Sequence, residues 1–127
     1  MPKVEYSKAK GLVQSTGSGF VMATETLTGA AALVADPGVA VTLCNSTAKT
    51  IVLADGTSVG QLKWFIAIHA DDNTVDPTTT AGAWDRFVLA EVGDSACLMW
   101  TVPGWVLLAR GSGATNAADA FDGPLVA

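Results

Sequence analysis

Residues 62–70, LKWFIAIHA, constrain the fold more than any other stretch, because both sides of the strand that they predict are largely apolar. Successive side chains of a β-strand point to opposite sides. One side therefore carries Leu62, Trp64, Ile66, Ile68 and Ala70, and the other carries Lys63, Phe65, Ala67 and His69. A strand with one side in water would alternate apolar and polar residues. Residues 62–70 are thus expected inside a sandwich or at a contact between subunits.

A second apolar strand is predicted immediately upstream, over residues 50–53. The tetrapeptide Ala54-Asp55-Gly56-Thr57 follows it, and an Asp-Gly step favours the positive φ angles of a tight reversal. We therefore expect residues 50–53 and 62–70 to pair as a hairpin at the centre of the fold.

Short apolar segments bounded by Gly, Pro and Asp recur along the rest of the chain, at spacings of about 8 to 12 residues. Residues 71–83 show no apolar period and are expected to form the longest loop. No long helix is indicated, so the pattern predicts an all-β, single-domain sandwich or barrel. The further strands are predicted at residues 20–27 and 30–34, where a short helix is the alternative, and at 39–44, 84–91, 95–102 and 105–109, the last two joined at Pro103-Gly104 as a second hairpin.

Charge divides the chain into three parts. Residues 1–10 hold three lysines and one glutamate, a net charge of +2, whereas the other 117 residues hold four basic and eleven acidic side chains, a net charge of −7. Residues 1–19 are predicted to be an extended N-terminal arm, residues 20–111 the β-domain, and residues 112–127 a Gly, Ala and Asp-rich tail. Nucleic acid is not an expected partner, because no basic stripe exists outside the short arm.

The surface is expected to be poor in charge. Half of the residues are hydrophobic and 15% are charged, against about 25% charged in a typical soluble domain. Either a partner covers part of this surface, which we favour, or Thr, Ser, Gly and Ala keep it soluble. No run of 18 apolar residues exists, and lysines interrupt the N-terminus, so neither a membrane span nor a secretory signal is expected. Cys44 and Cys97 are therefore predicted to be free, buried thiols rather than a disulfide.

The sequence offers no catalytic or metal-binding motif. His69 is the one histidine, beside Asp71 and Asp72, and a lone histidine on an apolar strand is usually a packed residue. Neither Gly-Ser-Gly triplet completes G-x-S-x-G, and GTSVG is not continued as a phosphate-binding loop. A calcium loop starting at Asp71 fails, because Asp76 and Gly82 stand where glycine and glutamate are needed. We expect no enzyme activity, no metal and no cofactor.

The four tryptophans, Trp64, Trp84, Trp100 and Trp105, have two interpretations. Exposed indoles can stack on sugar rings, whereas large aromatic side chains more often pack in a core. We favour the core, since Trp64 and Trp100 fall on apolar strand faces.

Five short sequence motifs follow one another along residues 53–107. They are L-A-D-G-T at residues 53–57, G-Q-L-K at 60–63, P-T-T at 77–79, V-G-D-S-A-C-L-M-W-T at 92–101 and G-W-V-L at 104–107. In this order and spacing, residues 38–111 resemble small structural proteins of tailed-bacteriophage heads, cyanophages included. Such proteins are described as decoration (cement) proteins, head fibres or parts of tail fibres. The chain departs from the pattern at Pro103-Gly104, where an Asn-Gly turn is usual.

The resemblance implies a capsid decoration protein that binds the outside of the assembled head, bridges major capsid protein subunits and is made in the host cytoplasm. It also implies a jelly-roll-like sandwich, with a small β-barrel or β-tulip as the alternative, and a homotrimer, without a membrane or nucleic-acid partner. The alternative function is a carbohydrate-binding module of a head or tail fibre. The residues expected to bind the capsid through the arm are Lys3, Tyr6, Lys8, Lys10, Leu12 and Val13. Those expected in the core or oligomer contact are Trp64, Ile66, Ile68, Trp100 and Trp105.

Overall fold

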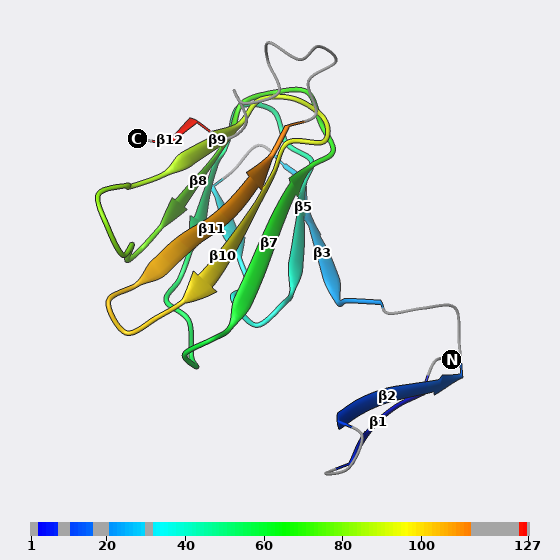
Figure 1. The fold of residues 1–127 in the computed structure, drawn as a ribbon. Helices are drawn as coiled ribbons and strands as arrows, with labels where there is room; N and C mark the ends of the chain where they lie inside the picture. The colour runs from blue at the N-terminus through cyan, green and yellow to red at the C-terminus, as the bar shows by residue number, and fades with distance from the viewer. Residues whose placement is uncertain (1–2, 8–10, 17–20, 30–31, 113–124, 127) are drawn as a thin grey trace.

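The computed structural model of the protein describes residues 3–7, 11–16, 21–29, 32–112 and 125–126, and it describes side chains within residues 21–29 and 32–112. Every regular element in these ranges is a β-strand, so the predicted all-β class is confirmed (Figure 1). β1 (Lys3–Ser7) and β2 (Gly11–Thr16) form a two-stranded ribbon. The other strands form two five-stranded sheets.

The two sheets pack face to face as a sandwich. Sheet I has the order β11 (Trp105–Gly111), β10 (Ser95–Trp100), β7 (Leu62–Ala67), β5 (Val41–Cys44) and β3 (Thr24–Leu27). Sheet II has the order β12 (Leu125–Val126), β9 (Phe87–Leu89), β8 (Asn73–Pro77), β6 (Thr50–Leu53) and β4 (Leu33–Ala35).

The path of the chain between the sheets sets the strand directions. From β3 to β8 each strand lies in the opposite sheet from the one before it, so β3, β5 and β7 run parallel in sheet I. For the same reason β4, β6 and β8 run parallel in sheet II. The remaining pairs, which involve β9 to β12, are antiparallel. A jelly roll is built from antiparallel strands, so the expected jelly-roll topology is not confirmed.

The expected hairpin between residues 50–53 and 62–70 is wrong. Both strands exist, but β6 belongs to sheet II and β7 to sheet I. Ile51 and Leu53 of β6 face Phe65 of β7 across the core, where burying apolar surface favours two layers over one. The Asp-Gly step therefore begins a longer crossing between sheets, in which Gly56 lies against the ring of Trp100.

The expected long loop at residues 71–83 is also wrong in part, because it contains β8. Asn73, Val75 and Pro77 point inward and are buried. Asn73 is polar, but its side chain accepts a hydrogen bond from Ser46 Oγ (2.6 Å) and donates one to the Asp71 carbonyl (2.8 Å). The sequence did not predict β8, because its inward side begins with a polar residue, Asn73, and ends with a proline, Pro77, so apolar and polar residues do not alternate along it.

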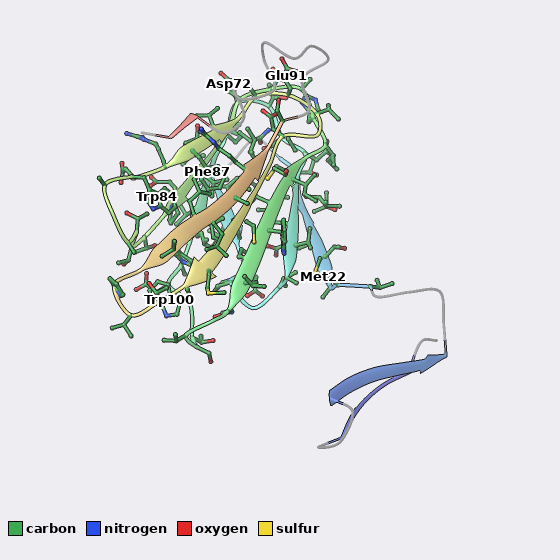
Figure 2. All side chains as sticks on the ribbon, in the orientation of Figure 1. Met22, Asp72, Trp84, Phe87, Glu91 and Trp100 are labelled. Atoms are coloured by element: carbon green, nitrogen blue, oxygen red, sulfur yellow. The ribbon has the colours of Figure 1, made fainter. Side chains whose placement is uncertain are left out.

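The core lies between the sheets and is centred on aromatic residues (Figure 2). Phe65 and Phe87 meet edge to face with ring centroids 5.8 Å apart, and Trp100 and Trp105 do so at 5.4 Å. Trp105 is fully buried, and its indole N–H donates to the Ala54 carbonyl at 3.0 Å. These contacts tie β11 to the segment that leaves β6.

Both ends of the chain contain short strands. The arm contains the antiparallel ribbon β1–β2, which Figure 1 shows set apart from the sandwich. At the other end, β12 pairs with β9, so two residues of the tail complete the edge of sheet II.

Candidate functional site

The outer face of sheet I is the candidate interface of the protein. Strand register places Trp64 between Val41 and Cys97, and Ile66 beside Leu43. On the same side Leu62 pairs with Met99, which in turn pairs with Val106. We call these side chains the apolar face: Val41, Leu43, Leu62, Trp64, Ile66, Cys97, Met99 and Val106.

None of the eight side chains of the apolar face is charged. Leu62 is 45% exposed, and Ile68, just beyond β7, is 41% exposed. Val41 and Cys97, which pair with Trp64 on either side, are buried although they point away from the core. A sheet face that meets water normally carries polar residues, so this face has the composition of a surface that a partner covers.

A small hollow lies beside Trp64 on this face. It has a volume of about 210 Å³, and its lining is mostly small: Trp64, Ser95, Ala96, Cys97, Ala109, Arg110 and Gly111. The register between β10 and β11 shifts next to it, between Cys97 and Leu98. The hollow can take a protruding side chain, which is the geometry of a packed contact.

The five residues expected in the core or oligomer contact separate into two groups. Trp64 and Ile66 lie on the apolar face, half-buried, and Ile68 lies next to it. Trp100 and Trp105 belong to the interior. None of the four tryptophans is exposed, so the structure presents no open indole platform for a sugar ring.

The six arm residues expected to contact a capsid cannot all be placed. Tyr6 and Leu12 are paired in the backbone of the ribbon, and Lys3 and Val13 also lie in its strands. Lys8 and Lys10, and the side chains of the other four, lie outside the described residues.

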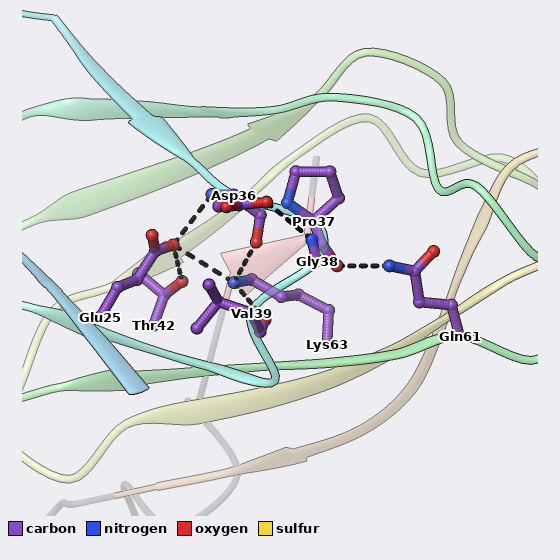
Figure 3. A network of polar contacts seen from close by, with 8 residues as sticks. All are labelled: Glu25, Asp36, Pro37, Gly38, Val39, Thr42, Gln61 and Lys63. Atoms are coloured by element: carbon purple, nitrogen blue, oxygen red, sulfur yellow. Dashed lines mark hydrogen bonds and ion pairs between the residues drawn. The ribbon is translucent and has the colours of Figure 1, made fainter. Parts of the chain in front are cut away.

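A buried cation supports the apolar face from beneath. Lys63 alternates with Trp64 along β7, so its side chain points inward and is fully buried (Figure 3). Its ammonium group donates to the carbonyls of Asp36 and Val39, at 2.8 Å each, and lies 3.3 Å from Glu25 Oε1. Burial lowers the pKa of Lys63, and the nearby Glu25 carboxylate opposes that change.

Glu25 extends this network to β3 and β5. Its Oε1 atom also accepts hydrogen bonds from Thr42 Oγ1 at 2.6 Å and from the Asp36 amide at 2.9 Å. The three parallel strands of sheet I and the turn at residues 36–39 are thereby fixed to one another. Sequence reasoning placed Lys63 on the side of Phe65 but missed its partners, which lie 24 or more positions away.

His69 and the two cysteines are the other side chains that the sequence analysis considered for catalysis or metal binding. His69 Nδ1 lies 3.2 Å from Asp71 Oδ2. Both cysteines are free and buried, as predicted, and Cys44 faces the core whereas Cys97 faces outward.

Across the part of the chain that the structure describes, no three His, Cys, Asp or Glu side chains are grouped to hold a metal ion. Nor does that part contain a helix of the length and apolar character needed to span a membrane.

Comparison with models of protein families finds none that matches this chain, and comparison with curated proteins finds no match either.

Proposed function

We propose that the protein is a capsid decoration protein that binds the outside of an assembled phage head and bridges its major capsid protein subunits. The apolar face of sheet I carries this proposal, because its side chains are uncharged and apolar, as is common on a surface that a partner covers. The sequence resemblance of residues 38–111 to head structural proteins supports the same assignment.

In this proposal the apolar face holds copies of the protein together. The part of the chain after residue 10 carries a net charge of −7, so copies of the protein repel one another. A contact made by uncharged side chains does not bring these like charges together. The Lys63 network fixes the strands that present the face, so little ordering is needed on assembly. We propose a homotrimer, as the resemblance implies.

The N-terminal ribbon is the proposed contact to the capsid. An isolated two-stranded hairpin is marginally stable in water, so β1–β2 is suited to ordering against another surface. The net charge of +2 over residues 1–10 favours an acidic partner and weakens in salt through screening. Binding only to the assembled shell stabilises that shell by mass action.

Removal of the arm tests this division. Full-length protein and a chain that starts at Phe20 are mixed with capsids stripped of the protein, and attachment is measured by co-sedimentation at several salt concentrations. We expect the shortened chain to fold and form trimers but not to attach. Attachment with unchanged affinity and salt dependence would assign the contact to the sandwich or the tail.

A further inference from the structure

The parallel strands of sheet I bring several loops together at one end of the sandwich. Because β3, β5 and β7 run in the same direction, the segments that follow them all emerge at the end where Asp72 is labelled in Figure 2. The Asn45 amide bonds to the Leu27 carbonyl (3.0 Å), and the Ile68 amide bonds to the Cys44 carbonyl (2.9 Å). The ladder thus continues into these loops and holds them side by side.

A cavity of about 650 Å³ opens between these loops. This volume is in the range of sites that bind small molecules. We call it the loop-end cavity, and its lining residues come from three separate segments: Thr28, Gly29, Asn45, Ser46, Thr47, Lys49 and His69.

One wall of the loop-end cavity, residues 46–49, is preformed. Ser46 is buried and donates to Asn73 Oδ1 at 2.6 Å, and the Lys49 carbonyl accepts from the Thr74 amide at 2.9 Å. Ala48, between these two anchors, has a φ of 46°, which is costly for a residue with a side chain. Such a conformation persists only where neighbouring contacts hold it, so residues 46–49 keep their shape without a ligand.

The charge of Lys49 favours a negatively charged ligand in the cavity. Lys49 makes no ion pair with any carboxylate in the described part of the chain, unlike Lys63 and Arg86. His69 Nδ1 lies 3.2 Å from Asp71 Oδ2, which leaves the ring's Nε2 as the nitrogen that can accept a hydrogen bond from a ligand hydroxyl. Among the residues that the structure describes, no Asp or Glu lines the cavity, and Asp71 lies behind His69.

The other lining groups are suited to hydroxyls. Thr28, Thr47 and Asn45 have side chains that both donate and accept hydrogen bonds, as sugar hydroxyls do. Lys49 would repel a cation. The Asn45 side-chain amide donates to Thr28 Oγ1 at 3.4 Å, but a purely apolar ligand would leave the other donor and acceptor positions of Thr28, Asn45 and Thr47 unpaired. An oxyanion alone would fill only a small part of the volume.

We propose that the loop-end cavity binds a sugar that carries an oxyanion, either a carboxylate or a phosphate. Lys49 holds the oxyanion, and Thr28, Asn45, Thr47 and His69 bind the hydroxyls. This site is separate from the apolar face and from the N-terminal arm, so the inference does not rest on attachment to a capsid.

Amide NMR titrations of the full chain test the site. The probes are glucuronate, glucose 6-phosphate, glucose and inorganic phosphate, and the signals are the amides of residues 45–49 and His69. We expect glucuronate, glucose 6-phosphate or both to bind at least about tenfold more tightly than glucose and inorganic phosphate. The stronger of the two acids identifies the oxyanion.

Lys49→Met provides the matched variant, and Arg86→Met, at an exposed arginine outside the cavity, provides the control. K49M should weaken binding of the acidic sugar about tenfold, with an unchanged unfolding midpoint, whereas R86M should leave it unchanged. Equal binding of glucose, equal binding of inorganic phosphate, no binding of either acid at 50 mM (roughly the weak limit of a specific site), or equal losses in K49M and R86M would each overturn the proposal.

Discussion

At the scale of one residue, Lys63 shows how a charged side chain is accommodated inside an apolar domain. Moving an ammonium group from water into a protein interior is unfavourable unless its donors are satisfied. The carbonyls of Asp36 and Val39, in one turn, and the Glu25 carboxylate, on β3, satisfy Lys63. The cation therefore acts as a joint between β3, β7 and the turn at residues 36–39.

Replacement of Lys63 by methionine should destabilise the domain by about 3 kcal/mol, because the Glu25 carboxylate loses its cation and the carbonyls of Asp36 and Val39 lose the ammonium donor. The measurement is the free energy of unfolding in guanidinium chloride. K49M is the control, since the Lys49 side chain makes no ion pair in the described part of the chain, and it should have no measurable effect. A K63M protein as stable as wild type would show that the network contributes nothing net.

Cys44 makes the stability depend on alkaline pH. Burial raises the pKa of its thiol from 9.0 to about 12. In the unfolded chain the thiol ionises near its ordinary pKa, so the contribution of the neutral thiol is complete below pH 9 and is lost as pH rises from 9 towards 12. The gap in unfolding free energy between wild type and Cys44→Ala should therefore shrink above pH 9, by at most about 1.4 kcal/mol per pH unit. A gap that stays constant from pH 8 to 11 would contradict the raised pKa.

At the scale of elements, local patterns indicated most strands but not how they pair. β5, β6, β7, β10 and β11 follow runs of apolar and β-branched residues, and the hairpin of β10 and β11 was predicted. The parallel pairs were not predicted, because the two strands of each pair are separated in the sequence by a strand of the other sheet. A short stretch of sequence does not show that the chain crosses between sheets. β8 was missed because Asn73 occupies an inward position, where the hydrogen bond from the distant Ser46 helps to satisfy its buried amide.

The crossing from β6 to β7 depends on Gly56. A Cβ atom at this position would overlap the indole of Trp100. Gly56→Ala should therefore destabilise the domain by about 1 to 3 kcal/mol through overpacking. Thermal unfolding checks this, with the exposed Ser58→Ala in the same segment as the control. Equal midpoints for G56A and S58A would show that the crossing is not packed as described.

At the scale of the whole molecule, the sequence indicated one of the two candidate sites. The two apolar sides of residues 62–70 predicted a covered face, and the structure places Leu62, Trp64 and Ile66 on the outside of sheet I. The loop-end cavity could not be predicted, because its lining residues are distant in sequence and meet only through the parallel winding of the chain. No motif of adjacent residues marks it.

The apolar face should determine the oligomeric state. Ile66→Lys places a charge in the middle of the proposed contact, where desolvation would oppose assembly. We expect light scattering to give the mass of a trimer for wild type and of a single chain for I66K, with the same circular dichroism. Val34→Lys, at a valine of sheet II that is 65% exposed, should remain trimeric. A monomeric wild type, or a trimeric I66K, would show that this face does not hold the copies together.

The position of the protein in an electron cryo-microscopy image of the intact virion tests the proposed function most directly. The account predicts density for the β-sandwich, in groups of three, on the outer surface of the head over junctions between major capsid protein subunits. Density for the sandwich in a tail fibre, or its absence from the head, would contradict the assignment as a capsid decoration protein.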